Sequence, residues 1–450
     1  MKIALSIAGS DSGAGAGIQA DLKTFSVLGV YGCTAITAIT AQNTKRVDEI
    51  VELPAELVEK QIRSVMTDMP PNAIKVGMVY STSIIDVVYD SLKRCKVPIV
   101  LDPIFFAGTG AKLLHSEAYK SYIARMIPAC SLVSPNKMEA EKLSGMAIRT
   151  REDAIKAAKK IKNLGAHNVI IKGSHHDSTH VTDLLLDSRN NLINFTNARL
   201  KIKEIHGSGC NFSAAVAAYL AKDIALTDAC RLANEYVHIG IQNALIIGQG
   251  LPIANPPSVI YRDANRYCTL LELQQAVEEV SVLDSFHKLI PETQTNFVYA
   301  LSDAVDISDV AGVRGRIVKI DNTAAPSSCV TFGASSHVAS AVIAYMTINP
   351  AFRSAINIRF EERLVKACRS LFSVASYDRS REPKMRKRKE GSSVSWGISA
   401  SLSKNPRADV IYHRGDVGKE PMIILFARNP AEIVERIKMI LKKISKATEI

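Results

Sequence analysis

Short apolar runs alternate with amphipathic stretches over residues 1 to about 250, and this alternation restricts the chain to few folds. Runs of Val, Ile and Ala without polar alternation predict strands that are covered on both faces. Strands that alternate with helices in this way predict an α/β fold, with a doubly wound and mostly parallel sheet. The expected strands are Ile3–Ala8, Ala73–Gly77, Ile99–Asp102, Ser131–Ser134 and Val169–Lys172.

Nearly every expected strand ends in a small or polar residue that has no obvious use in a core. In open α/β sheets the ligand crevice lies beyond the carboxyl ends of the strands. We therefore expect these strand ends, although distant in sequence, to converge on one pocket. They are Gly9-Ser10-Asp11-Ser12-Gly13, Gly77-Met78, Asp102-Pro103, Pro135-Asn136 and Lys172-Gly173.

Local signals also place helix ends and a domain boundary. Thr150 with Asp153 three residues later, and Gly165 beyond, predict a helix over Thr150–Leu164. The pattern breaks at Asn255-Pro256-Pro257-Ser258, which is typical of a linker. We expect a first domain at 1–252, a linker at 253–269 and a second α/β domain at 270–450. Its expected elements are a helix from Leu270 to about Leu283, strands at Phe297–Ser302, Arg316–Ile320 and Met422–Phe426, and a helix over about Ala431–Ile444.

Composition excludes some classes of protein. No apolar run reaches the ~18 residues of a membrane span, so we expect a cytoplasmic protein with no membrane partner. The eight cysteines form no C-x-x-C pair, which argues against a zinc site and a disulfide framework.

The formal net charge is +12, which fits either nucleic acid or anionic substrates such as phosphates. The dense basic run from Arg379 to Lys389 has few aromatic neighbours. We interpret it first as a solvated loop, second as a phosphate-contacting loop and last as a nucleic-acid surface. We therefore expect small-molecule substrates and no nucleic acid.

The segment His206-Gly-Ser-Gly-Cys210 carries the strongest local signal for chemistry. It precedes an Ala-rich helix expected at Asn211–Ala221. Glycines let several backbone N–H groups point at one spot, and the helix N-terminus adds about half a positive charge there. Gly207, Ser208 and Gly209 could thus bind a phosphoryl group during transfer, or form only a glycine turn that caps the helix.

Three other segments of the first half each allow a functional and a structural interpretation. Glu139, in Asn136-x-x-Glu139, could hold Mg²⁺ through water or could simply open a helix. Lys172, at the end of a Val/Ile strand, could contact a phosphate or extend to solvent. The loop Gly9–Gly17 is neither a dinucleotide fingerprint nor a P-loop, and a role in close approach to a substrate stays open.

In the second half, Gly333-Ala-Ser-Ser-His337 precedes a helical run to about Met346. Small residues at a helix start suit a bound phosphate, and His337 could donate to an anion there. An ordinary cap with a surface histidine is the alternative. Arg316 heads an expected strand, where its guanidinium could bind a pyrophosphate through two hydrogen bonds.

Ordered blocks of the first half resemble hydroxymethylpyrimidine/phosphomethylpyrimidine kinase, of the ribokinase-like superfamily. The resemblance covers roughly residues 1–250 and implies a ribokinase-like fold, ATP as phosphoryl donor and Mg²⁺. The blocks are AGSDSGAGAGIQADLKTF (8–25), TAITAQNT (37–44), KVGM (75–78), LDPI (101–104), SPNKMEAEKL (134–143), IIKGSH (170–175) and HGSGC (206–210).

This resemblance implies a role for each matching residue. Gly9, Asp21, Gln42 and Met78 would line the pyrimidine pocket. Lys172 and Asn136 would bind ATP, with Glu139 and Asp102 near Mg²⁺, and Gly207 to Cys210 would form the anion hole. Cys210 stands where relatives in the superfamily place an Asp base, so it would act as base or as a small apolar wall. The sequence departs from the familiar pattern at Lys45-Arg46-Val47 and in the loop after Asp102.

The second half resembles the archaeal-type thiamine-phosphate synthase domain, over about residues 275–445. The blocks are Gly312–Lys319, Gly333–Ala339, Asn357-Ile-Arg359 and Tyr412–Pro421. This resemblance implies condensation of a pyrimidine pyrophosphate with thiazole phosphate, with Arg316 and His337 stabilising the pyrophosphate that departs.

Two alternative functions and an oligomeric state also follow from the sequence. The second half could instead be a regulatory domain that senses thiamine phosphate. The kinase could act on pyridoxal or another vitamin alcohol. The kinase family commonly forms dimers, so we also expect a homodimer.

Overall fold

The computed structural model describes residues 1–200, 202, 204–382, 392–416 and 419–448. The chain divides into two compact units, Met1–Tyr261 and Arg262–Ile450, and each is described by itself. In the described part of the chain, no helix combines the length and apolar character needed to cross a membrane.

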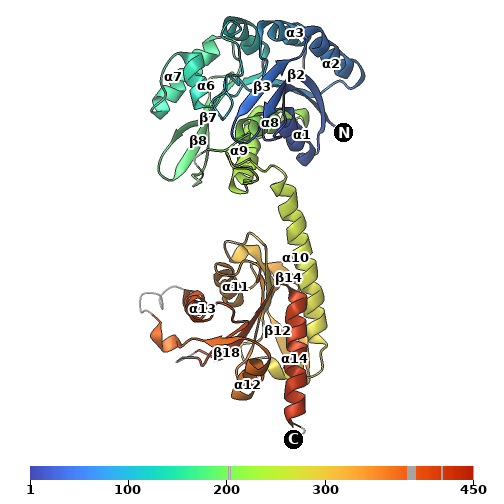
Figure 1. Cartoon of the computed structure of the whole chain (residues 1–450), viewed down its shortest axis with the longest axis vertical. Helices are drawn as coiled ribbons and strands as arrows, with labels where there is room; N and C mark the ends of the chain where they lie inside the picture. The colour runs from blue at the N-terminus through green and yellow to red at the C-terminus, as the bar shows by residue number, and fades with distance from the viewer. Residues whose placement is uncertain (201, 203, 383–391, 417–418, 449–450) are drawn as a thin grey trace. The chain divides into compact units, whose positions relative to one another are not determined.

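A nine-stranded sheet forms the middle of the first unit, in the order β3-β2-β1-β4-β5-β6-β7-β8-β9 (Figure 1). The strands from β2 to β7 along this order are parallel, whereas β3, β8 and β9 are antiparallel to their neighbours. The strands are β1 (Ile3–Asp11), β2 (Tyr31–Gln42), β3 (Val47–Glu52), β4 (Ala73–Val76), β5 (Ile99–Leu101), β6 (Leu132–Val133), β7 (Val169–His176), β8 (His180–Leu186) and β9 (Leu192–Ala198). The expected doubly wound, mostly parallel sheet is confirmed.

Helices cover both faces of this sheet, because successive side chains of each strand point to opposite sides. Leu5 and Ile7 of β1 pack with one helix layer, and Ala4 packs with the other. The first layer holds α2 (Ala55–Asp68), α3 (Thr82–Leu92), α6 (Lys137–Ser144) and α7 (Arg151–Asn163), with the short α4 (Tyr119–Ser121) and α5 (Ile127–Ala129). The second holds α1 (Gly17–Val27), α8 (Ser208–Ala221) and α9 (Leu226–Gln242).

Local capping explains two of these helix starts. Thr150 accepts a hydrogen bond from the amide of Asp153, whose carboxylate accepts from the amide of Thr150. Asn136 and Glu139 form the same reciprocal pair at the start of α6. The predicted cap of α7 is thus confirmed, and a capping box of this kind satisfies two amides that the helix itself cannot bond.

Several predicted boundaries were wrong, including the following three. β1 continues through Gly9 to Asp11 because it pairs with β2 as far as Thr40. Helix α8 begins at Ser208, so the glycine turn itself enters the helix. The helix expected from Leu270 is α10 (Ser258–Ser281), which occupies most of the segment expected as a linker.

The second unit holds a seven-stranded sheet in the order β14-β11-β10-β15-β18-β17-β16, plus the hairpin β12–β13. The sheet is antiparallel except between β16 and β17. Its strands are β10 (Phe297–Ala300), β11 (Val310–Val313), β14 (Val330–Phe332), β15 (Ser354–Arg359), β16 (Val374–Ser376), β17 (Val410–His413) and β18 (Met422–Ala427), and the hairpin is β12 (Ile317–Ile320) with β13 (Thr323–Pro326).

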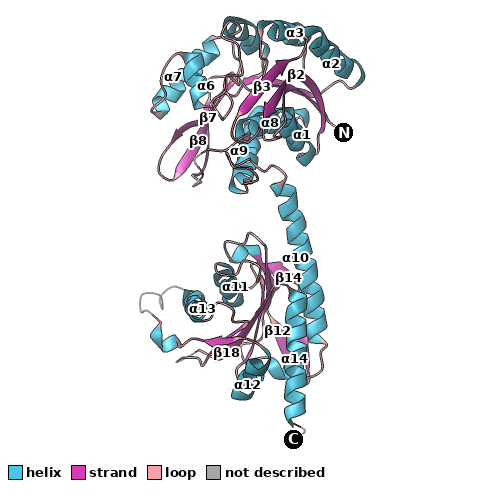
Figure 2. Ribbon diagram, viewed as in Figure 1, coloured by secondary structure: helices cyan, strands magenta, loops and turns pink. Residues whose placement is uncertain are grey.

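Helices again cover both faces of this sheet, so the unit is α/β as expected (Figure 2). One layer holds α10, α12 (Glu362–Leu371) and α14 (Pro430–Thr448). The other holds α11 (His337–Met346) and α13 (Ser392–Lys404).

Candidate functional site

A cavity of about 180 Å³ lies at the carboxyl ends of the parallel strands in the first unit. The strand ends therefore converge, as the sequence predicts. The predicted site residues that line it are Gly9, Gln42, Met78, Asp102, Asn136, Glu139, Lys172, Gly207, Ser208, Gly209 and Cys210.

The N-terminus of α8 forms one wall of this cavity. Gly207 has a φ of +84°, and a Cβ there would lie 1.8 Å from the carbonyl oxygen of Gly15. Only glycine fits, and no side chain caps the helix. The first amides of α8 border the cavity through Ser208 and Gly209, which is an arrangement that binds phosphate groups.

Lys172 stands beside this helix start. Its Nζ lies 2.7 Å from Oδ1 of Asp102, whose Oδ2 accepts a 3.2 Å hydrogen bond from Ser213 on α8. Burial disfavours the charged ammonium, but Asp102 and Glu139 hold the pKa of Lys172 above its ordinary value. The lysine is therefore cationic at neutral pH and can contact a phosphate.

Glu139 is buried in the same wall. Burial raises its pKa to about 8, against the opposing effect of Lys172 and with a contribution from the negative charge of Asp102. Two carboxylates that repel each other in one cavity are a suitable environment for a hard cation. The described residues contain no group of three or more His, Cys, Asp or Glu side chains that could hold a metal ion.

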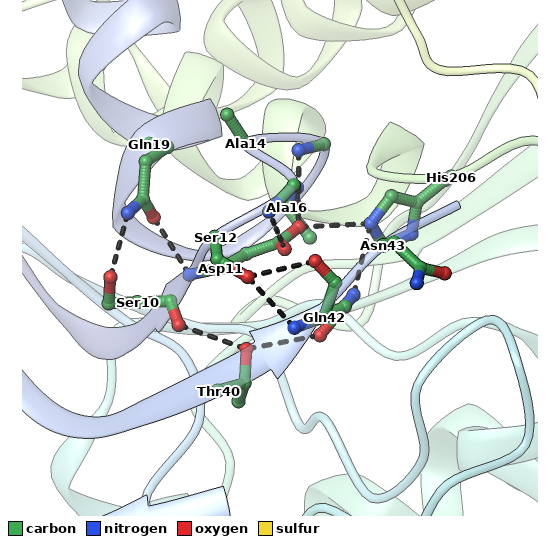
Figure 3. A network of polar contacts seen from close by, with 12 residues as sticks. Ser10, Asp11, Ser12, Ala14, Ala16, Gln19, Thr40, Gln42, Asn43 and His206 are labelled. Atoms are coloured by element: carbon green, nitrogen blue, oxygen red, sulfur yellow. Dashed lines mark hydrogen bonds and ion pairs between the residues drawn. The ribbon is translucent and has the colours of Figure 1, made fainter. Parts of the chain in front are cut away.

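Asp11 and His206 also line the cavity, and the sequence assigned a role to neither, although Asp11 lies in a strand end expected at the pocket. Oδ2 of Asp11 lies 3.0 Å from Nε2 of His206 and accepts from the amides of Gly15 and Ala16 (Figure 3). Burial would raise the pKa of Asp11, but hydrogen bonds from His206 and from backbone amides hold it below its ordinary value. The His206 in the quoted motif and the strand end at Asp11 were the signals available in the sequence.

The structure does not support Cys210 as a general base. Burial raises the pKa of its thiol to about 12, and the nearby Lys75 only partly offsets this. A base role requires a lowered pKa, whereas the pKa of this thiol is raised, so the structure favours a neutral thiol at Cys210. Its side chain forms a small wall of the cavity, which is the alternative that the sequence left open.

Asp21, expected in the pyrimidine pocket, does not line this cavity. It is completely buried, with Oδ2 at 2.8 Å from Nζ of Lys75 and 2.6 Å from Oγ of Ser6. Lys75 is equally buried, and the charge of Asp21 raises its pKa against the effect of burial. The two charges pair in the core because an isolated buried charge would be costly.

A second cavity of about 750 Å³ adjoins the first in the same unit. The two cavities share Asn136, Lys172, Ser208 and Gly209. Phe212, Val237 and Ile241 give the larger cavity an apolar side. The phosphate-binding groups thus lie where a larger ligand and a smaller one could meet.

In the second unit, a cavity of about 290 Å³ brings together Arg316 and His337, the two residues expected to act there. Arg316 precedes β12 with a φ of +75°, and its Nη1 donates to the carbonyl of Thr293. The start of α11 enters the same cavity through Ser335, Ser336 and His337. The cavity therefore brings together two cationic or donor side chains and a helix N-terminus, all of which favour a bound anion.

Two further residues of this cavity were not predicted as site residues, Arg379 and His413. Arg379 is only 3% exposed, so the preferred interpretation of the basic run as a solvated loop is wrong at its first residue. Lys384, Arg386, Lys387, Arg388 and Lys389 lie outside the described residues. His413 ends β17 inside the quoted block Tyr412–Pro421, which was the signal available in the sequence.

Comparisons with known proteins agree with both halves. Residues 11–255 match the family model of phosphomethylpyrimidine kinase, and residues 272–439 match that of thiamine-phosphate synthase ThiN. A hydroxymethylpyrimidine/phosphomethylpyrimidine kinase of Rhizobium meliloti is 44% identical over 55% of this chain and 94% of its own length. The solved ADP complex of Bacillus subtilis pyridoxal kinase has a TM-score of 0.54 and 32% identity, covering 58% of this chain and 99% of that one.

One relative matches across both halves. The bifunctional thiamine biosynthesis protein ThiDN of Methanocaldococcus jannaschii is 30% identical over 98% of each chain. The chain therefore belongs to the family of bifunctional proteins in which a phosphomethylpyrimidine kinase precedes a thiamine-phosphate synthase of the ThiN type.

Proposed function

We propose that the chain carries out two successive steps of thiamine synthesis. Residues 1–252 phosphorylate hydroxymethylpyrimidine and then its monophosphate with ATP, and residues 270–450 condense the resulting pyrophosphate with thiazole phosphate. Residues 253–269 join the two domains. The observation that carries this proposal is the presence of an anion-binding helix start in a separate cavity of each unit.

In the kinase domain, ATP occupies the larger cavity with its phosphates toward the shared residues Lys172, Ser208 and Gly209. The pyrimidine occupies the smaller cavity, between Gly9, Gln42 and Met78. The side chain amide of Gln42 offers both a donor and an acceptor, which suits an aminopyrimidine. The substrate hydroxyl then faces the terminal phosphate across the start of α8.

Phosphoryl transfer gains from positioning and from charge stabilisation rather than from a strong base. The amides of Ser208 and Gly209 stabilise the negative charge on the migrating group, and Lys172 neutralises part of it. Asn136 contributes its side chain at the ATP end of the same wall. These groups are in place before the reaction, so little reorganisation is needed at the transition state.

Magnesium fits this site, where Glu139 would hold it through water, with Asp102 beside it. The cation would neutralise ATP phosphates and relieve the repulsion between the two carboxylates. The remaining residues do the positioning described above.

In the synthase domain, the thiazole nitrogen donates its lone pair to the methylene carbon of the pyrimidine, and a C–N bond forms. The C–O bond to the diphosphate breaks, and its electron pair leaves with the diphosphate. Arg316 and His337 bind that group and stabilise the charge that develops on it.

The two activities are separable by variants of the full chain. Lys172→Met should abolish phosphorylation but still give thiamine phosphate from supplied pyrimidine pyrophosphate. Arg316→Gln should accumulate pyrimidine pyrophosphate from the alcohol and Mg-ATP. Lys159→Met and Arg407→Gln change exposed residues outside the cavities and serve as matched controls. Mass spectrometry of the products decides each case.

An intact chain that stops at the pyrimidine pyrophosphate would contradict the synthase proposal. Such a chain, if it bound thiamine phosphate in calorimetry, would instead carry a regulatory second domain. The similarity to pyridoxal kinase makes pyridoxal the second kinase substrate to assay. Equal turnover of pyridoxal and the pyrimidine alcohol would remove the pyrimidine specificity from the proposal.

We also propose a homodimer that works in the cytoplasm, where ATP is supplied. The dimer is supported by two half-exposed apolar side chains that pair across neighbouring strands, Ile39 on β2 and Val51 on the edge strand β3. Light scattering of the purified chain tests the dimer, and a monomer at micromolar concentration would contradict it.

A further inference from the structure

Arg379 is a buried guanidinium with an unused donor. It follows β16 in a short helical turn, Arg379–Arg381, and only 3% of its surface is exposed. Its Nη2 is buried and has no hydrogen-bond partner among the described residues. A buried charge with an unpaired donor is costly unless a ligand provides the partner.

Inside the cavity, the described side chains around Arg379 supply no unpaired anion. Glu382, a buried carboxylate at the end of the same turn whose Oε1 has no hydrogen-bond partner among the described residues, does not line the cavity. The cavity also holds Arg316, His337, His413 and Lys419. Glu420 is the carboxylate that lines it, and its oxygens accept from the amides of Glu292 and Thr293 and from the hydroxyl of Thr293. The cavity therefore keeps an excess of positive charge.

His413 supports this description. Its Nδ1 accepts a 3.1 Å hydrogen bond from the amide of Gly415, so the neutral ring carries its proton on Nε2. Burial first, and then the charges of Arg379, His337 and Lys419, lower the pKa of His413 to about 3. The imidazole is thus a neutral donor in a cavity that also holds the cations Arg316, Arg379 and Lys419.

We infer that Arg379 is a further catalytic residue of the synthase site, where its guanidinium binds the diphosphate group that leaves the pyrimidine. A guanidinium presents two parallel N–H groups that match two phosphate oxygens. As the C–O bond breaks, negative charge grows on the diphosphate, and Arg379 stabilises it together with Arg316. The first residue of the basic run thereby acquires the phosphate-contacting role that was the second interpretation of that run.

This inference rests on the proposed synthase activity, and its test is arranged so that the two can fail separately. The full chain is compared with Arg379→Gln, Arg379→Lys and the exposed control Arg407→Gln. Condensation is measured from supplied pyrimidine pyrophosphate and thiazole phosphate. Binding of inorganic pyrophosphate is measured by calorimetry, which needs no turnover. Trp396, the chain's one tryptophan, reports by fluorescence whether the second unit is folded.

We expect Arg379→Gln to bind pyrophosphate at least about tenfold more weakly and to lose condensation by a similar or larger factor. Arg379→Lys should recover part of the binding, because it keeps the charge without the two parallel donors. Phosphorylation of the pyrimidine alcohol should not change in either variant. Arg407→Gln should match the intact chain throughout.

Folded Arg379→Gln that equals the intact chain in pyrophosphate binding and in condensation overturns the inference. If Arg379→Gln does not fold, the same comparison is made with Arg379→Lys, where unchanged affinity and rate overturn it. An intact chain that binds pyrophosphate through Arg379 but never condenses contradicts the proposed synthase and keeps Arg379 as an anion-binding residue.

Discussion

Asp11 and His206 are 195 positions apart in the sequence, yet Oδ2 of Asp11 lies 3.0 Å from Nε2 of His206. This contact joins the end of β1, where the next loop begins, to the loop that precedes α8. The two loops also approach through glycine, since a Cβ on Gly15 would lie 2.2 Å from the ring of His206. Asp11 thus connects the end of β1 to the segment before α8 at the wall of the smaller cavity.

Asp11→Asn should therefore impair the kinase without removing a group that reacts. We expect kcat/KM for the pyrimidine alcohol to fall roughly tenfold to a hundredfold, which corresponds to ~1.5–3 kcal/mol for lost charge-assisted hydrogen bonds. Steady-state assays of the full chain with Mg-ATP measure this loss.

Asp177→Asn is the matched control for Asp11→Asn. Asp177 also accepts from backbone amides, those of Thr179 and His180, but it lies on an exposed turn outside the cavities. Its variant should keep full kinase activity. Equal activity of Asp11→Asn and the intact chain would show that the loop contact does not position the site.

Cys210→Ala tests the neutral thiol at the cavity wall. Because burial raises the thiol pKa to about 12, we expect phosphorylation within a few-fold of the intact rate between pH 6 and 9. Loss of a general base typically costs a factor of 10²–10⁴. Rate measurements across this pH range test whether Cys210 acts as a base. The control is Cys33→Ala, which removes a buried thiol outside the cavity. A loss of more than about a hundredfold in Cys210→Ala alone would restore the base role.

Asp21 and Lys75 should contribute to stability rather than to substrate affinity. Breaking a buried ion pair by removing one partner costs about 3–5 kcal/mol. We expect Lys75→Met to lower the free energy of unfolding of the first unit by this order, and Lys75→Met with Asp21→Asn to recover part of it. Urea unfolding followed by circular dichroism measures both. A raised KM for the pyrimidine in folded Asp21→Asn, at unchanged KM for ATP, would instead place Asp21 in binding.

The sequence predicted β1, β4, β5, β6 and β7 because these strands are apolar on both faces, and their polar ends follow from the parallel topology, but it did not predict β2, β3, β8 and β9. Met78, Asp102 and Lys172 could be placed at one edge for that reason, whereas Gln42 was placed by the resemblance alone. Asp21 was misplaced because a carboxylate on α1 looks the same in sequence whether it faces a cavity or the core. Only the position of Lys75 on β4 decides between the two.

The missed residues have a common physical cause. Asp11 acts through His206, and Arg379 acts beside His413 and Arg316, so each role depends on contacts between distant segments. Arg379 begins a run of cations, and such runs are usually solvated. Its burial results from the packing of the turn after β16, which has no local signature.

His413 should make the second unit sensitive to acid. Its folded pKa of about 3 lies below the ordinary value of 6.5, so the unfolded chain takes up a proton that the folded chain refuses. The contribution of the neutral His413 to the free energy of unfolding is present above pH 6.5 and is lost as the pH falls from there toward 3. Between pH 6.5 and 4.5 we expect a loss of about 2 kcal/mol, measured by urea unfolding followed by Trp396 fluorescence. His413→Gln, which keeps a donor but does not titrate, should show a smaller loss, whereas the exposed control His180→Gln in the first unit should behave as the intact chain. An equal acid response of His413→Gln and the intact chain would show that His413 is not the group responsible.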